Sequence, residues 1–503
     1  MSDRESGGRS GPAPPSGPAS PGYLTGTNAI LVLAGLFLAI LLAGLDALVV
    51  STALPTIAAS LHQASGITFV VGAYLITSTV SIPIFSKLSD RYSRRNVFLV
   101  GLAVFLVGSA LSGASQSLAE LIAFRGIQGF GTGGFVPVGI AMVSVLFPPK
   151  ERARLTGILA GAGGISIAVG PLLGSYIVDV TTWRWVFYVN LPLGVAATIL
   201  LLATLGPLRP EARGRIDVPG AVLLSGWVAS LMFALVQVSE AGWAWTDPRV
   251  EVLLALAVGL FAAFVVRELR APDPMVPLRL LGRRAIGASA GIAAFNGVVF
   301  TSVLTFLSVL VGIVLLRSGP NAANDVRDMI YFCAGPMILG AAICGQLLSR
   351  FSYRAVVAPA LAVAVGSMAA LTTVSPTTPL WVLAFGFLPT GGLVLPLIPM
   401  GFGLGVALAG TLIVVQNEAS QVEVGAAIGF NRFLQSLGGA VGLSLLTAFQ
   451  EWRLTVHAST GTDPSGALAA IVASYDDVFI VLAVLLLLAF LCSLGLKGRV
   501  PNG

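Results

Sequence analysis

Two charged residues stand inside stretches of sequence that are otherwise apolar. Asp46 lies within residues 29–52, and Arg125 lies within residues 118–147. An ionisable group inside a long apolar segment is costly and is therefore a functional residue by default. A carboxyl group there can bind and release a proton, and an arginine can neutralise it or hold an anion. Two interpretations of Asp46 stay open: a proton carrier, or a structural carboxylate hydrogen-bonded to the backbone or to Arg125.

The composition leaves little room for other chemistry. The 503 residues are 56% hydrophobic and 10% charged, with a mean hydropathy of +0.93. Soluble domains carry about 25% charged residues, so lipid must be the main solvent of this chain. The two histidines and the three cysteines form no metal-binding pattern, and no phosphate-binding loop ending in Lys-Ser or Lys-Thr occurs. We therefore expect no metal, no cofactor and no enzymatic activity. Nucleic-acid binding is not expected either, because the basic residues are spread over loops.

The apolar residues fall into fourteen stretches that are long enough to cross a bilayer. The predicted spans are residues 29–52, 66–86, 96–115, 118–147, 153–178, 185–206, 218–239, 250–267, 285–316, 328–349, 354–374, 380–415, 424–450 and 477–496. Each should be a helix, because backbone polar groups cannot stay unpaired in hydrocarbon. The spans 285–316 and 380–415 are overlong and are either tilted or broken. Pro396 and Pro399 favour a break in the second of them.

The charge distribution predicts the orientation. With an even number of spans, both chain ends lie on one side, and that side carries 21 Lys and Arg residues against five on the other. The positive-inside rule places the richer side in the cytoplasm. We expect a multi-pass protein of the plasma (inner) membrane with two cytoplasmic tails, residues 1–27 and 497–503. The first tail is rich in Pro, Gly and Ser and should be disordered.

The chain also repeats itself weakly. Residues 86–95 align with residues 345–354, and residues 129–133 align with residues 401–405, in the same order and orientation. Chance similarity between apolar sequences is the alternative explanation. A parallel repeat predicts two six-helix bundles related by an axis along the membrane normal, with the substrate site between them.

The repeat sets the expected domain organisation. The N-terminal bundle covers residues 28–206, and the C-terminal bundle covers residues 284–496. The two spans within residues 207–283 are then an insertion between the bundles. We expect this inserted pair to pack outside the central cavity.

Four motifs accompany this organisation. They are Leu-Asp-Ala-Leu-Val-Val-Ser-Thr-Ala-Leu-Pro at 45–55, Ser-Lys-Leu-Ser-Asp-Arg-Tyr-Ser-Arg-Arg at 86–95, Leu-Ile-Ala-Phe-Arg-Gly-Ile-Gln-Gly-Phe-Gly at 121–131, and Gly-Ile-Ser-Ile-Ala-Val-Gly-Pro-Leu-Leu-Gly-Ser at 164–175. With these motifs the sequence resembles the major facilitator superfamily, in its fourteen-helix drug:proton antiporter branch. The resemblance covers all fourteen spans and implies the fold of two six-helix bundles plus two inserted helices. It implies a proton-coupled antiporter that exports small lipophilic molecules; the alternatives are a proton-coupled importer of a small solute and a transporter-like membrane sensor.

The resemblance implies roles for individual residues. Asp46 and Arg125 are implied in proton coupling, with Gln128 and Gly129 in the same motif as Arg125. The motif at 86–95 is implied to latch the two bundles together on the cytoplasmic side, through Asp90, Arg91, Arg94 and Arg95. The motif at 164–175 resembles the antiporter motif of this branch, in which Gly170 and Pro171 are implied to kink the helix. The glycine face that includes Gly174 is implied to pack against the other bundle.

The motifs depart from the family pattern at several positions. Serine stands at 86, 93 and 175 where the pattern has glycine, Leu48 stands where a threonine is usual, and Ser51 stands where an asparagine is usual. Residues 183–194, in contrast, match the entry to the sixth helix of this branch well. The latch loop therefore lacks the two glycines of the family pattern.

The acidic residues of the last six spans bear on the charge of the substrate. No acidic residue falls in the middle of these predicted spans, which argues for neutral, anionic or monocationic substrates rather than polyvalent cations. Asn431 and Arg432 lie inside the thirteenth span and either bind a substrate anion or pair with the backbone. The expected partners are a lipophilic small molecule, protons and the lipid bilayer, and we expect the chain to function as a monomer.

The positions of Asp46 and Arg125 predict a contact. Asp46 precedes Pro55, the expected outer end of its helix, by about 13 Å of helix axis. Arg125 lies about 10 Å along the axis from Leu118, where its helix enters the membrane from the same side. We therefore predict that the two side chains meet, directly or through one water molecule.

Overall fold

The fold is that of an all-α membrane protein. The computed structural model describes residues 23–63, 66–67, 69–206, 208, 217–241, 243–276, 278–315, 322–372, 391–458 and 464–499. Within these ranges the regular structure is helical, with no strand, and fourteen helical segments are long and apolar enough to cross a membrane. The predicted fold class and number of spans are confirmed. Most of the predicted N-terminal tail lies outside the described residues.

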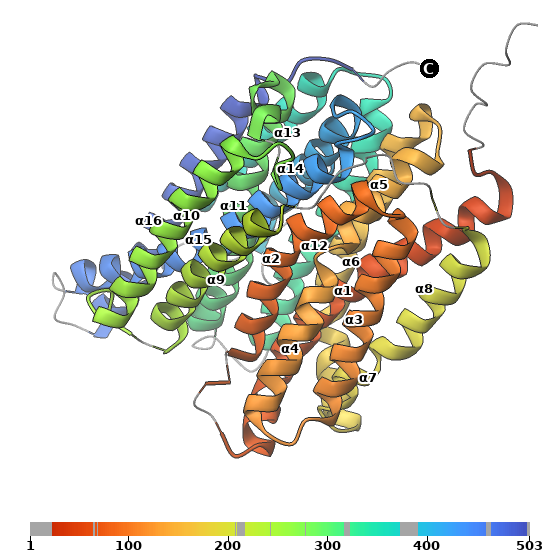
Figure 1. Cartoon of the computed structure of the whole chain (residues 1–503). Coiled ribbons are helices and arrows are strands. Elements are labelled where there is room, and N and C mark those ends of the chain that lie inside the picture. The colour runs from red at the N-terminus through yellow and green to blue at the C-terminus, as the bar shows by residue number, and fades with distance from the viewer. Residues whose placement is uncertain are drawn as a thin grey trace, which may run out of the picture.

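Two bundles of six spans make up most of the molecule (Figure 1). The N-terminal bundle contains α1 (Gly26–Ser60), α2 (Phe69–Arg91), α3 (Arg94–Ala114), α4 (Leu118–Thr132) with α5 (Phe135–Leu146), α6 (Pro149–Val180), and α7 (Trp185–Tyr188) with α8 (Asn190–Thr204). The C-terminal bundle contains α11 (Arg284–Leu315), α12 (Ala322–Leu348), α13 (Tyr353–Leu371), α14 (Gly391–Glu418), α15 (Val424–Ala458) and α16 (Pro464–Ser493).

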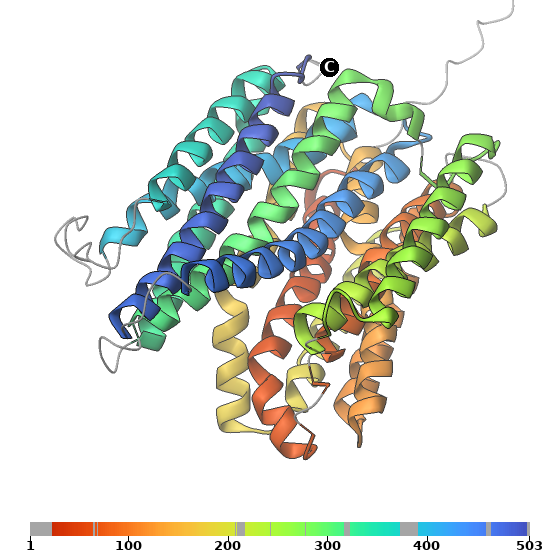
Figure 2. The ribbon, with the colours of Figure 1, turned by 90° about the vertical axis from the view of Figure 1, so that its left-hand side faces the viewer.

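Two inserted helices, α9 (Val218–Ala241) and α10 (Pro248–Arg270), separate the bundles in sequence and are followed by the short 3₁₀ helix η1 (Leu278–Gly282). Figure 2 views the molecule from the side on which α9 and α10 lie. The indole of Trp227 in α9 packs edge-on against Phe433 of α15, with ring centroids 6.1 Å apart. The same apolar cluster includes Val80 of α2. The inserted pair therefore covers the line along which α2 meets α15.

The fourth span is broken at a position that the prediction did not mark. Gly133 and Gly134 separate α4 from α5. A Cβ at Gly134 would lie 2.9 Å from Cγ of Phe85 in α2, and a Cβ at Gly133 would overlap the hydroxyl of Ser81. Pro137 also lacks the N–H that would bond to the Gly133 carbonyl. Close packing on α2 and one missing backbone bond together explain the break.

The break predicted at Pro396 and Pro399 was wrong, because both residues lie inside α14, which begins at Gly391. Each proline removes one backbone hydrogen bond, to the carbonyls of residues 392 and 395, but the helix continues through both positions. The other overlong span, α11, is also a single helix.

Two helix ends differ from the prediction. The helix α1 continues beyond Pro55 to Ser60. The last span begins at Ala469 rather than at residue 477, so Asp476 lies inside it and Asp477 is not its first residue. The carboxylate of Asp477 lies 2.6 Å from Nε of Arg453 and pairs with it close to the end of α15. Asp476 and Asp477 thus lie seven and eight residues inside this span, whereas we expected no acidic residue in the middle of the last six spans.

The two bundles touch at the end of the molecule where the first and last described residues lie, near Leu24 and Gly498, which we call the closed end. There the backbone N–H of Leu24 donates to the carbonyl of Leu146, and the N–H of Tyr353 donates to the carbonyl of Gly498. Glycine allows close contact between bundles at this end, because a Cβ at Gly157 of α6 would lie only 2.7 Å from the carbonyl oxygen of Ala341 in α12.

A central cavity of about 270 Å³ lies between the bundles. Its described walls come from α1, α2, α4, α5, α6, α11 and α15, together with Gly133 at the break in the fourth span, and contain no residue of α9 or α10. A second, apolar cavity of about 430 Å³ is bordered by Met232, Leu235 and Val236 of α9. The inserted helices thus stay outside the first cavity, whereas α9 joins α1, α2, α11 and α15 in the wall of the second.

Candidate functional site

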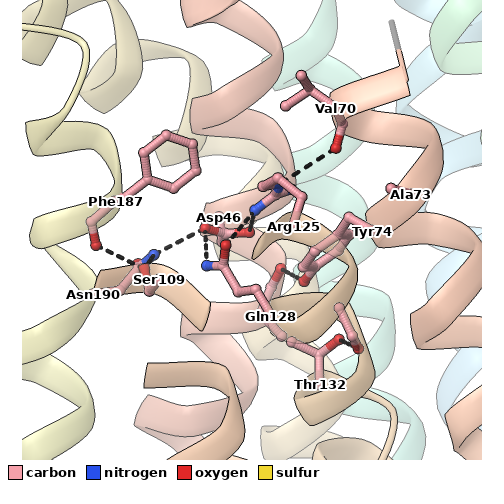
Figure 3. A network of polar contacts seen from close by, with 12 residues as sticks. Asp46, Val70, Ala73, Tyr74, Ser109, Arg125, Gln128, Thr132, Phe187 and Asn190 are labelled. Atoms are coloured by element: carbon pink, nitrogen blue, oxygen red, sulfur yellow. Dashed lines mark hydrogen bonds and ion pairs between the residues drawn. The ribbon is translucent and has the colours of Figure 1, made fainter. Parts of the chain in front are cut away.

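The carboxylate of Asp46 is buried in α1 and accepts hydrogen bonds from three side chains (Figure 3). Arg125 donates to Oδ2 over 2.5 Å, Gln128 donates to Oδ1 over 2.7 Å, and Asn190 donates to Oδ1 over 2.9 Å. The contact predicted between Asp46 and Arg125 is present and is direct. Because all three neighbours are donors, the arrangement suits an ionised carboxylate.

The guanidinium of Arg125 is enclosed on all sides. Its Nη1 also donates to Oε1 of Gln128 over 2.8 Å, and its Nε donates to the carbonyl of Val70 over 3.4 Å. The ring of Tyr74 lies 4.2 Å from the guanidinium carbon, close enough for a cation–π contact. Arg125 is completely buried, so its charge depends on Asp46 for neutralisation. Protonation of Asp46 would remove that neutralisation.

Asn190 reaches Asp46 from a break in the sixth span, between α7 and α8. Pro192 has no N–H to continue the backbone ladder at this point. Asn190 also donates to the hydroxyl of Ser109, which in turn donates to the carbonyl of Phe187. Our site prediction omitted Asn190 and Ser109. The available signals were an amide side chain two residues before a proline in an apolar span and the match of residues 183–194 to the family pattern.

Tyr74 separates the central cavity from the ion pair. It lines the cavity, and its hydroxyl donates to the carbonyl of Ala43 over 3.2 Å. The ring covers the guanidinium of Arg125, as Figure 3 shows. A movement of this one ring would therefore bring the cavity into contact with the buried pair.

The predicted latch lies at the closed end. The carboxylate of Asp90 in α2 accepts the backbone N–H groups of Gly425 and Ala426, at 3.0 and 2.8 Å, at the first turn of α15 in the other bundle. Carboxylates are stabilised at helix N-termini by these free N–H groups and by the helix dipole. Arg94 lies 3.5 Å from Asp90 and donates to the carbonyl of Gln421. Asp90 and Arg94 therefore join the two bundles.

The other two latch residues contact different elements. Arg95 donates to the carbonyl of Leu205 in its own bundle. Arg91 pairs with Asp273, which lies in the linker between α10 and α11 (residues 271–283). Lys87 joins the same carboxylate at 2.7 Å and donates to the carbonyl of Pro274. The linker thus supplies the counter-charge for two basic residues of α2.

The linker also contacts the C-terminal bundle. Arg279 pairs with Glu423 at 2.9 Å, and Arg283 donates to the carbonyl of Glu418. Between them, Leu280 is buried in a cluster that includes Ile140 of the N-terminal bundle and Val424 of α15. The linker therefore crosses the closed end and is fastened to both bundles.

A further ion pair ties the two inserted helices together. Nη2 of Arg267, near the end of α10, donates to Oδ1 of Asp217 over 2.8 Å, just before α9 begins. Burial opposes ionisation of Asp217, but hydrogen bonds from Arg267 and from the N–H of Gly220 outweigh it and hold the pKa of Asp217 below its usual value. Asp217 is therefore ionised at neutral pH.

The serine at 86 fits the interface because of a glycine opposite. Ser86 is fully buried and its hydroxyl donates to the carbonyl of Ile82. A Cβ at Gly429 of α15 would overlap the Ser86 side chain. In the family pattern a glycine in α2 allows the two helices to approach closely. Here Gly429 of α15 allows the same close approach.

The antiporter motif at 164–175 packs only in part as the resemblance implies. A Cβ at Gly170 would lie 2.7 Å from Cβ of Leu48, and a Cβ at Gly174 would lie 2.9 Å from the carbonyl oxygen of Val49. Gly170 and Gly174 of α6 therefore face α1 of the same bundle, whereas Gly164, the first residue of the motif, packs on the other bundle, where an added Cβ would overlap Ile338 of α12. Pro171 lies inside α6, which remains one helix from Pro149 to Val180. The motif supports the part of α1 that directly follows Asp46.

The structure separates Asn431 from Arg432. The amide of Asn431 donates to the carbonyl of Ser289 and ties α15 to α11. Arg432 lines the central cavity and donates to Oε1 of Gln435. Asn431 is thus a packing residue, whereas Arg432 faces the space between the bundles.

The family follows from the sequence comparison. Residues 36–443 match the family model of the Major Facilitator Superfamily, and the chain belongs to this family. The chain is 31% identical over 429 residues to the multidrug transporter protein MdtP of Bacillus subtilis, covering 84% of this chain and 75% of that protein. It is 30% identical over 411 residues to the tetracenomycin C resistance and export protein of Streptomyces glaucescens, covering 81% and 73%. It is also 29% identical over 480 residues to the puromycin resistance protein pur8 of Streptomyces alboniger, covering 91% and 90%.

Solved structures share the fold. The human organic anion transporter MFSD10 superposes with a TM-score of 0.59 at 19% identity, over 92% of this chain and all of that chain. The proton:xylose symporter XylE gives a TM-score of 0.60 at 13% identity, over 91% and 95%. The family and these relatives make the protein a multi-pass membrane transporter rather than an enzyme.

Proposed function

We propose that this transporter exports small lipophilic molecules from the cytoplasm across the plasma membrane in exchange for protons. The observation that carries the proposal is the buried network around Asp46. Its single negative charge is balanced by Arg125, and the ring of Tyr74 both packs on Arg125 and lines the central cavity. Relatives named for multidrug transport and for resistance to tetracenomycin C and puromycin support the choice of drug-like substrates.

The proposed cycle alternates between two conformations. In the arrangement described here, Asp90 and the linker hold the closed end shut. We assign this end to the cytoplasm, together with both chain ends, because the basic loops lie there. A proton that binds Asp46 leaves Arg125 without its counter-charge, which is costly in a buried site. Rearrangement of the bundles relieves that cost, and release of the proton to the cytoplasm restores the pair.

The test is a flux measurement with defined gradients. Purified protein in proteoliposomes should move a drug-like substrate towards the more acidic compartment when a pH gradient is imposed. The Asp46→Asn variant should lose this gradient-driven flux and retain substrate binding. Substrate-induced proton release from detergent-solubilised protein should also disappear in this variant. Undiminished proton release from Asp46→Asn would remove Asp46 from the mechanism, and flux in the opposite direction would make the protein an importer.

A further inference from the structure

The central cavity contains a positive charge that the protein itself does not neutralise. Arg432 is the only charged residue among the described residues that line this cavity. Its one polar side-chain partner in the described part of the chain is Gln435, a neutral amide. Arg125, the other arginine in the middle of a span, is neutralised by Asp46. A cation inside a membrane protein normally faces a partner or a water-filled space.

We propose that Arg432 is a substrate-binding residue and that the cavity takes an organic anion with an apolar body. This inference rests on the proposed export function and names its substrate class. The guanidinium offers a planar set of N–H donors that suits a carboxylate, a phenolate or a sulfonate. An anion in the cavity supplies the counter-charge that the described walls lack.

The walls of the cavity fit the two parts of such a molecule. Arg432, Gln435 and Ser436 lie within one turn of α15 and form a polar edge. The hydroxyl of Ser436 is already engaged with Thr79 at 2.8 Å, so the polar group left for a ligand is centred on Arg432. Ile40 and Phe300 are apolar groups on other helices that line the same space. An aromatic acid can place its ring against these groups and its anionic group against Arg432.

The position of Gln435 strengthens the assignment. It lies three residues after Arg432 on the same helix and holds the guanidinium through one hydrogen bond. A bond from one nitrogen restricts the side chain and leaves further N–H groups for a ligand. The protein thus orients the guanidinium without neutralising it.

The test compares two probes of nearly equal shape. 2-Naphthoate is an anion at pH 7.5, and 2-naphthamide is its neutral counterpart. Binding is measured by titration calorimetry on the full chain in a non-ionic detergent, without a pH gradient. Wild-type protein should bind 2-naphthoate about tenfold or more tightly than 2-naphthamide, as expected for a charge-assisted pair.

The variants separate charge from folding. Arg432→Gln should lose the preference while binding 2-naphthamide as wild-type protein does, and Arg432→Lys should keep part of the preference. Arg354→Gln is the matched control, because Arg354 is exposed on α13 and does not line the cavity. The ratio of the two affinities is taken within each variant and so does not depend on the fraction of active protein.

The outcomes distinguish this inference from the proposed function. A preference that persists in Arg432→Gln overturns the inference, and so do equal affinities or no binding of either probe in wild-type protein. None of these results depends on what drives transport. A failure of gradient-driven flux, with the preference for 2-naphthoate intact in Asp46→Asn, would contradict proton exchange and leave Arg432 as the anion-binding residue.

Discussion

Oδ2 of Asp90 in one bundle lies 2.8 Å from the backbone nitrogen of Ala426 in the other. A side chain of α2 thus caps the helix α15, and the contact exists only while the two bundles are together at this end. A carboxylate at a helix N-terminus stabilises the helix by about 0.5–2 kcal/mol. The same energy here favours one conformation of the transporter over the other.

The first prediction concerns this cap. Asp90→Asn keeps the size of the side chain but replaces one acceptor oxygen with a donor that faces an N–H group. We expect the closed end to lose about 1–2 kcal/mol of stabilisation and the export rate to fall by about tenfold or more, with folding and substrate binding retained. Flux in proteoliposomes and binding in detergent give the two readouts. Asp179→Asn, at an exposed position of α6, is the control. Export at the normal rate by Asp90→Asn would show that the cap does not act as a latch.

The second prediction concerns the shape of Arg125. Arg125→Lys keeps the positive charge but cannot contact Asp46, Gln128 and the Val70 carbonyl at once. We expect substrate-induced proton release to be impaired, with substrate affinity unchanged. Arg453→Lys makes the same change in the pair with Asp477 at the end of α15 and should leave proton release intact. Equal proton release from the two variants would contradict a specific role for the guanidinium.

The third prediction concerns the packing of α6 on α1. The added methyl group of Gly174→Ala meets the Val49 carbonyl at 2.9 Å and also overlaps Thr52, so one helix must move. We expect a loss of about 1–3 kcal/mol in stability and a marked loss of transport, because the displaced segment of α1 follows Asp46. At Gly161 on the same helix, the nearest atom to an added Cβ is 3.8 Å away, so Gly161→Ala is the matched control. Thermal unfolding and flux measured on both variants decide the point.

The fourth prediction concerns the linker. Asp273→Asn removes the carboxylate shared by Lys87 and Arg91. Because Asp273 is 37% exposed, we expect the closed conformation to lose about 1–2 kcal/mol, less than for a fully buried pair. Spin labels at Tyr92→Cys and Phe351→Cys, which are exposed residues of the two bundles, report the separation at the closed end. The native cysteines are replaced in this background.

The distance distribution should shift towards longer values in Asp273→Asn. Asp247→Asn is the control, since Asp247 forms an exposed pair with Arg249, remote from the latch. Identical distributions for Asp273→Asn and wild-type protein would show that the linker does not hold the bundles together.

Much of the architecture could be predicted from the sequence, because a membrane imposes a simple rule on composition. Runs of apolar residues revealed all fourteen spans, and two charges inside such runs predicted the pair of Asp46 and Arg125. The start of the last span was misplaced because Asp476 resembles a loop residue and Asp477 resembles a residue at a helix end. In the structure one of them is paired with Arg453, which reduces the cost of its charge.

Other features depend on tertiary contacts that a single sequence does not show. The role of Asn190 follows from the approach of α8 to α1, and the break at Gly133 follows from close packing on α2. The glycines at 170 and 174 signalled close approach correctly, but they could not tell which helix is approached. The ion pairs of Asp273 could not be predicted either, because its partners lie about 180 residues earlier in the chain.

The linker has a consequence for the modularity of the inserted pair. Joining Thr204 directly to Arg284 would give a chain of twelve spans with both six-helix bundles complete. That chain would retain Lys87 and Arg91 at the closed end but lose Asp273, their shared counter-ion. It would also lose Leu280, which fills the space between Ile140 and Val424. Removing or exchanging helices α9 and α10 therefore also removes contacts that hold the closed end together. A functional twelve-span derivative would need a new acidic residue near Lys87 and Arg91.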